Sequence, residues 1–132
     1  MNRIVAHFQD GRLMKGLTND FLPAKAAFHL SGEGQPAGTK PVEVRVAELK
    51  ALFFVRTFEG NPEHRKTGDA TADRAGQGRR IRVVFKDGET LVGTTQGYDR
   101  SRPGFFVVPV DEGSNNERCF VVTSATQDVS FL

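Results

Sequence analysis

Residues 2–18 read NRIVAHFQDGRLMKGLT, and residues 79–95 read RRIRVVFKDGETLVGTT. A shift of 77 positions aligns these two stretches without a gap, and the match continues along the chain. The identical pairs include Arg3/Arg80, Ile4/Ile81, Phe8/Phe85, Asp10/Asp87, Gly11/Gly88, Gly16/Gly93, Thr18/Thr95, Phe28/Phe105 and Phe54/Phe131. Self-similarity at a fixed offset indicates an internal duplication. The shared residues are apolar and turn residues, so the sequence says more about fold than about function.

The duplication divides the 132 residues into a first unit at 1–56, a connecting segment at 57–79 and a second unit at 80–132. A unit of about 55 residues is near the lower limit for a self-sufficient core, so we expect the units to pack on each other. The connecting segment contains one Phe and no Val, Ile or Leu. Such a composition is typical of a flexible linker.

Short stretches of alternating apolar and polar residues predict β-strands throughout both units. In the second unit Ile81, Val83 and Phe85 alternate with their neighbours, and Asp87-Gly88 supplies a hairpin turn. Gly93, inside the next strand, predicts a bend or a close backbone approach. The expected strands are 4–8, 13–18, 26–30, 41–46, 51–55, 81–85, 90–95, 105–110, 118–123 and 128–132, with one possible helical turn in 47–52. The fold class predicted is all-β, with two tandem five-stranded small barrels.

The second unit is apolar on the strand faces that should point outward as well as on those that point inward. The outward set is Val84, Phe106, Val108, Phe120, Val122 and Leu132. Monomers rarely expose a patch of this kind, so it should contact the first unit or another copy of the chain. Homo-oligomerisation through this face is therefore one expectation.

Residues 83–132 resemble the Sm-like barrel, on the spacing of Phe85, Asp87-Gly88, Gly93 and Tyr98-Asp99. This resemblance implies a small barrel and, as one function, RNA binding by two fused barrels in place of two ring subunits. The strings at 49–56 and 97–106 are similar to an uncharacterised bacterial domain family that is associated with signalling and regulatory proteins. That second resemblance covers nearly the whole chain and implies no particular activity.

Charge and cysteine content restrict the class of protein. Eighteen basic and sixteen acidic residues leave a net charge of +2, which is weak for a protein that binds nucleic acid. Cys119 is the only cysteine, so an intrachain disulfide is excluded and a reducing cytoplasm is expected. We expect no membrane association, because the N-terminus lacks a signal-peptide core and no stretch reaches the length of a membrane span.

Catalytic signals are absent from the sequence. The three histidines lack the paired spacing of a zinc site, and no serine lies in a nucleophile-elbow motif. We therefore expect neither an enzyme nor a metal or other cofactor.

The candidate binding residues are those found in only one unit, because the shared fold does not require them. They are Arg100, Arg102, Asp111, Asn115, Asn116 and Arg118, in the loops on either side of the strand expected at 105–110. Guanidinium groups beside amides suit a phosphate, a carboxylate or a partner's backbone. The alternative is that these are ordinary turn residues.

Together these observations predict a non-catalytic binding or regulatory module with a protein partner, in bacterial signalling or regulation. The alternatives are an Sm-like RNA-binding protein and an enzyme whose site lies between the units.

Overall fold

A computed structural model describes residues 2–32, 38–55, 78–99, 101–109 and 116–132, with backbone only for 116 and 117. Most of the predicted linker, 57–77, lies outside these residues. The strands are β1 (Asn2–Phe8), β2 (Leu13–Thr18), β3 (Ala27–Gly32), β4 (Val42–Arg45), β5 (Leu49–Val55), β6 (Arg79–Phe85), β7 (Thr90–Thr95), β8 (Gly104–Pro109), β9 (Asn116–Val122) and β10 (Thr126–Phe131).

All ten predicted strands are present, with ends that differ by at most two residues from the expected ranges. The all-β prediction is therefore confirmed. The helical segments in the described ranges are two 3-10 turns, η1 (Val46–Glu48) and η2 (Thr123–Ala125), and η1 overlaps the predicted helical turn. No helix in this part of the chain is long and apolar enough to cross a membrane.

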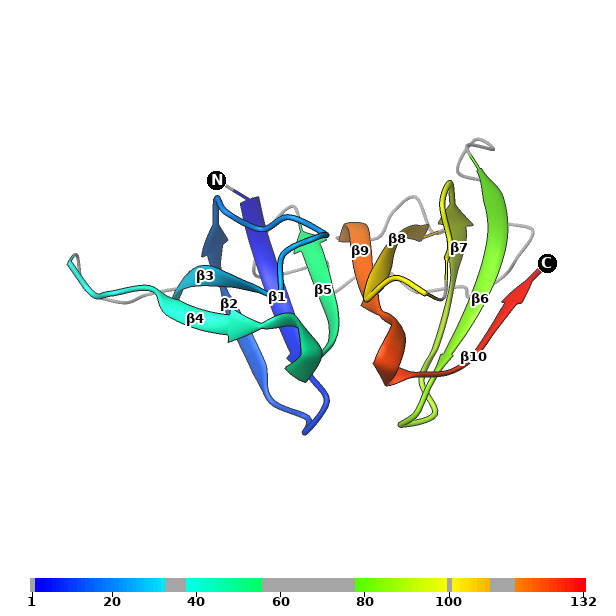
Figure 1. Ribbon diagram of the computed structural model, residues 1–132, viewed down its shortest axis with the longest axis horizontal. Helices are drawn as coiled ribbons and strands as arrows, with labels where there is room; N and C mark the ends of the chain where they lie inside the picture. The colour runs from blue at the N-terminus through cyan, green and yellow to red at the C-terminus, as the bar shows by residue number, and fades with distance from the viewer. Residues whose placement is uncertain (1, 33–37, 56–77, 100, 110–115) are drawn as a thin grey trace, which may run out of the picture.

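The strands form one open antiparallel sheet in the order β10-β6-β7-β8-β9-β5-β1-β2-β3-β4. We call β1–β5 the N-terminal half and β6–β10 the C-terminal half. The prediction of two closed barrels is not confirmed, because closing the first half would require β5 to pair with β4. The free edge of β5 pairs with β9 instead, which joins the halves at the centre of the sheet (Figure 1).

The two halves share one strand order, 5-1-2-3-4 in the first and 10-6-7-8-9 in the second. They also share one register. Ile4 is opposite Gly16 and Phe54, while Ile81, 77 positions later, is opposite Gly93 and Phe131. The offset seen in the sequence is thus an offset between structurally equivalent positions.

The two strand glycines are required by a close backbone approach. A Cβ atom on Gly16 would lie 2.3 Å from the carbonyl oxygen of Ser31, and one on Gly93 would lie 2.3 Å from that of Val108. Backbone atoms cannot rotate away as a side chain can, so only glycine fits at either position.

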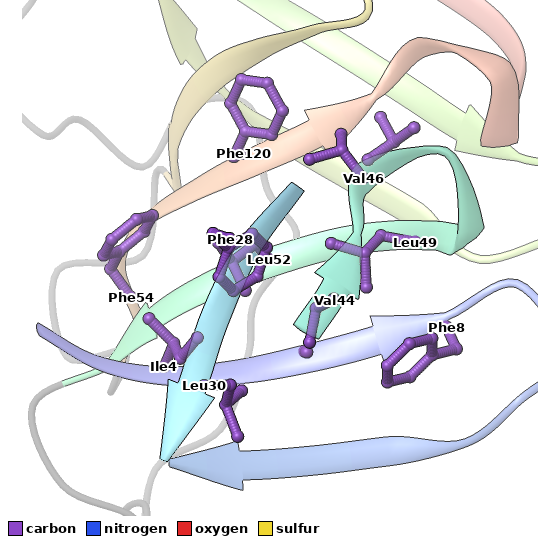
Figure 2. Close-up of a cluster of buried hydrophobic side chains, with 12 residues drawn as sticks. Ile4, Phe8, Phe28, Leu30, Val44, Val46, Leu49, Leu52, Phe54 and Phe120 are labelled. Atoms are coloured by element: carbon purple, nitrogen blue, oxygen red, sulfur yellow. The ribbon is translucent and has the colours of Figure 1, made fainter. Parts of the chain in front are cut away.

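Each half has its own hydrophobic core, and each core is completed by the other half. The N-terminal core consists of Ile4, Ala6, Phe8, Phe28, Leu30, Val44, Val46, Leu49, Leu52 and Phe54, together with Phe120 and Val122 from β9. Figure 2 shows Phe120 on β9 together with the other labelled members of this cluster. The C-terminal core is built around Ile81, Val83 and Phe85 and takes in Ala51, Phe53 and Val55 from β5.

The apolar outer face predicted for the second unit is thus partly used within the chain. Phe120 and Val122 belong to the N-terminal core, and Phe106 packs against it. Val108 and Leu132 are 38% and 55% exposed. Packing of one unit on the other is confirmed, and association of copies through the remaining face stays a prediction.

Candidate functional site

The 3-10 turn of each half is held against the loop that precedes the third strand of that half. The Val46 N–H donates to the Ala26 carbonyl at 2.9 Å, and the Thr123 N–H donates to the Pro103 carbonyl at 2.9 Å. These two bonds join equivalent positions, 77 residues apart. Pairing of β5 with β9 brings both assemblies together at the junction.

A groove of about 600 Å³ lies where these assemblies meet. Residues 24–26 and 46–47 line it from the N-terminal half, and residues 101–103 and 122–124 line it from the C-terminal half. Apart from Val122, the lining residues are five equivalent pairs, Ala24/Ser101, Lys25/Arg102, Ala26/Pro103, Val46/Thr123 and Ala47/Ser124. The groove is therefore made from the same two segments of each half.

A second cavity of about 370 Å³ shares Ala24, Arg102 and Pro103 with the groove. Its wall includes the rings of Phe106 and Phe120. The Phe120 ring occupies the space beside Gly104, where an added Cβ would lie 2.4 Å from it. Arg102 thus borders both cavities, and aromatic side chains line the second one.

The groove presents one exposed cation from each half. Lys25 Nζ donates to the backbone carbonyl of Asp20 at 3.3 Å, and Arg102 Nε lies 4.0 Å from Asp99 Oδ2 with its side chain 70% exposed. The hydroxyl and N–H of Ser101 both donate to Asp99 Oδ1. These two bonds lower the pKa of Asp99 below its usual value, so its carboxylate stays ionised beside Arg102.

Both contacts are weak restraints on the cations. Lys25 makes one long hydrogen bond to an exposed backbone carbonyl, and an exposed ion pair such as that of Arg102 contributes little to stability and is screened by salt. Lys25 and Arg102 can therefore exchange these contacts for an anionic group of a ligand. The surrounding walls are mostly methyl and ring carbons, from Ala24, Ala26 and Pro103 among others.

Two of the candidate residues that the sequence predicted to act together, Arg102 and Arg118, have described side chains. Arg102 borders the groove. Arg118 is on β9, and its guanidinium carbon lies 4.4 Å from the centre of the Phe54 ring and 4.9 Å from that of Phe106. Arg118 therefore stacks across the junction as a cation–π contact rather than projecting from a loop.

The other candidates are not placed. Arg100, Asp111 and Asn115 lie outside the described residues. The backbone of Asn116 begins β9, and its side chain is not described. The predicted convergence of the two loops stays a prediction.

The sequence reasoning missed Lys25, because it selected features present in only one unit. The signal was available, since Lys25 stands 77 positions before Arg102 and both are cations. A pair of like charges at equivalent positions indicates a shared surface only when the halves are known to meet there. The pairing of β5 with β9 supplies that information.

Other chemical groups are less well arranged for function. Cys119 is buried in the C-terminal core. In the described part of the chain, no group of three or more His, Cys, Asp or Glu side chains could hold a metal ion.

Residues 1–132 match DUF6982, a family of unknown function, and the chain belongs to this family. No curated protein and no solved structure matches the chain. The family match agrees with the expected likeness to an uncharacterised domain family. The Sm-like and signalling relationships have no match behind them and stay predictions.

Proposed function

We propose that this member of DUF6982 is a non-catalytic binding module that holds a segment of a partner protein in the groove between its halves. The observation that supports the proposal is the groove itself, with mostly apolar walls and one exposed cation, Lys25 or Arg102, from each half. The proposed setting is regulation in the bacterial cytoplasm. The common register of the halves supports an origin by duplication of one five-stranded small-barrel unit.

The lining predicts the chemistry of the partner segment. A cavity of about 600 Å³ is within the usual size range of ligand sites. Apolar side chains of the segment would contact Ala24, Ala26 and Pro103. An Asp, a Glu or a terminal carboxylate would lie by Lys25 and Arg102, where the guanidinium can donate two parallel hydrogen bonds.

The lining also supports a binding role over a catalytic one. Among the described residues of the groove there is no His, Cys, Asp or Glu. Those side chains are the usual general acids and bases, and a serine or threonine hydroxyl such as those of the groove needs a neighbouring base to act as a nucleophile. The polar groups that remain are hydroxyls and two cations, which suit recognition.

The same two cations support RNA binding as a second candidate, because they could contact successive phosphates. The net charge of +2 is unfavourable for that function. Salt dependence separates the two candidates, since affinity for a polyanion falls steeply with salt and affinity for an apolar segment does not.

A displayed library of short peptides tests the proposal. Peptides are selected for binding to the wild-type chain, and their Kd values are then measured for the wild type and for the double variant Lys25→Glu/Arg102→Glu. The matched control is Lys15→Glu/Arg82→Glu, which makes the same charge change at two exposed strand positions, one in each half, that do not line the groove.

Selected peptides should combine apolar residues with a carboxylate. Their Kd should rise about tenfold or more in the groove variant and should not change in the control. An equal loss in both variants would contradict the proposal. Tight binding of oligo(U) or oligo(A) at physiological salt, lost only in the groove variant, would favour RNA.

A further inference from the structure

The junction between the halves joins unlike edges. In the strand order, β10 is the counterpart of β5 and β4 is the counterpart of β9. Pairing of unlike surfaces can in principle repeat from copy to copy, giving rings or filaments. Within the described residues, β4 and β10 each have one hydrogen-bonded neighbour, so each carries an open edge. Figure 1 shows them at opposite ends of the sheet.

The residues on β10 differ from those on β5 at the face that forms the junction. On β5 this face is Ala51, Phe53 and Val55, all buried in the C-terminal core. Their counterparts 77 positions later are Asp128, Ser130 and Leu132. The Ser130 hydroxyl donates to Asp128 Oδ2 at 2.9 Å. Two of three apolar groups are thus replaced by polar ones.

β4 differs from β9 in the same way. Phe120 and Val122 of β9 are buried in the N-terminal core. Their counterparts on β4 are Glu43 and Arg45, whose side chains are exposed and 3.8 Å apart. The open edge of β4 therefore carries charges where the joined edge of β9 carries apolar side chains.

An ion cluster distinguishes the junction further. Lys50 Nζ lies 2.7 Å from Asp87 Oδ2 and 2.7 Å from Glu89 Oε1, so β5 is tied to the β6–β7 hairpin of the other half. The ammonium also lies 4.8 Å from the centre of the Phe85 ring.

The free edges lack the components of this cluster. The counterpart of Lys50 on β10 is Gln127. In the β1–β2 hairpin Arg12 stands in place of Glu89, and its Nε contacts Asp10 at 2.7 Å. If β10 of one copy approached β4 of another, it would bring Gln127 in place of the Lys50 ammonium. The β1–β2 hairpin of the second copy would offer Asp10, whose charge is already neutralised by Arg12.

We propose that these substitutions end the sheet at both edges, so that copies of this chain do not extend it and the junction groove described above forms once in each chain. The inference stands apart from the proposed function, because it rests on β4, β10 and Lys50 rather than on the groove. The end of the sheet also limits the number of grooves, because a groove forms only where a strand equivalent to β5 pairs with a strand equivalent to β9.

The register of the junction shows why a second copy is rejected. Ala51 is opposite Val121 and Leu52 is opposite Phe120. The same register between β10 and the β4 of another copy would set Asp128 opposite Val44 and Val129 opposite Glu43. Carboxylates would be buried against apolar side chains with no new partner, which is strongly unfavourable.

Light scattering on the whole chain tests the inference directly. The wild-type protein should form no assembly through β4 and β10 as its concentration is raised, so any association through the outer face of the C-terminal half should leave amide exchange in these two strands unchanged. A mass that grows with concentration, together with slower amide exchange in β4 and β10, would overturn the proposal.

Two variants test the cause. Asp128→Ala/Ser130→Phe gives β10 the junction residues of β5, and Glu43→Phe/Arg45→Val gives β4 those of β9. Each variant alone should keep the mass of one chain. Their equimolar mixture should form a 1:1 complex of twice that mass, and Gln127→Lys in the first variant together with Arg12→Glu in the second should strengthen it, because the pair restores an ammonium and a second carboxylate.

The control is Arg82→Phe, an exposed position on β6, a strand with neighbours on both sides. Mixtures that contain it in place of either edge variant should not associate. If the edge variants stay monomeric when mixed, or associate no better than the control, the edge residues do not end the sheet. The wild-type measurement decides the matter if a variant fails to fold.

Discussion

Replacement of Phe120 by alanine should destabilise both halves of the protein at once. Phe120 is on β9 of the C-terminal half, is fully buried, and packs in the N-terminal core, with its ring 5.1 Å from that of Phe21 and 5.2 Å from that of Phe106. A Phe→Ala change in a core costs about 3–5 kcal/mol. Against a typical total of about 5–15 kcal/mol, this is a large fraction of the stability.

Urea unfolding followed by two probes measures this effect. The chain has no tryptophan and one tyrosine, Tyr98, which packs against Phe105 in the C-terminal half. Tyr98 fluorescence therefore reports that half, and far-ultraviolet circular dichroism reports the whole sheet. Both transitions should coincide in the wild type and should move together in Phe120→Ala.

The control is Phe131→Ala on β10, where the ring is 41% exposed and should cost less than half as much. The reasoning is refuted if Phe120→Ala costs less than about 1 kcal/mol, well below the range for buried aromatic residues. It is also refuted if the two probes separate in the wild type, since the halves would then unfold independently.

Gly93→Ala should lower the free energy of unfolding by about 1–3 kcal/mol or more, because the new methyl group would overlap a backbone carbonyl of β8, and thermal unfolding measures this. Lys50→Gln should destabilise the chain near neutral pH, whereas Gln127→Ala should not. Burial opposes the charge of Lys50, but hydrogen bonds to two carboxylates raise its pKa in the folded protein. The ion cluster therefore stabilises the fold fully at pH values below the usual lysine pKa, and this stabilisation is lost as the pH rises through the raised pKa of the folded state. Hydrogen bonds from the backbone N–H and the ring of His29 lower the pKa of Asp20 to about 2. The Asp20 carboxylate therefore stabilises the fold fully above the usual aspartate pKa, and this stabilisation is lost as the pH falls through about 2. In Asp20→Asn, the free energy of unfolding should fall less steeply with decreasing pH. If the acid part of the stability–pH curve is unchanged, other carboxylates cause the fall.

The sequence alone determined the strands and their local connections. Alternation at period two and the Asp-Gly turns act over a few residues, so they can be read without knowledge of the fold. Gly16 and Gly93 likewise indicated a bend or a close backbone approach, and the structure shows a carbonyl oxygen of the neighbouring strand close to each. The offset of 77 identified which residues occupy equivalent positions in the two halves.

The candidate site could be predicted only in part. Arg102 was selected from the sequence and borders the groove, whereas Lys25 was missed and Arg118 stacks on two rings. A groove is the space left between segments that are distant in sequence. Its lining therefore depends on how the halves meet, which no local pattern encodes.

Only the tertiary structure decided that β5 pairs with β9 instead of closing a barrel on β4. The run at 51–55, ALFFV, predicts a strand, but it does not identify the neighbouring strand. Backbone N–H and C=O groups are the same on every strand, so an edge accepts any partner that its side chains allow. The choice is made by contacts across the chain, with Phe53 in one core, Phe120 in the other, and Lys50 between two carboxylates.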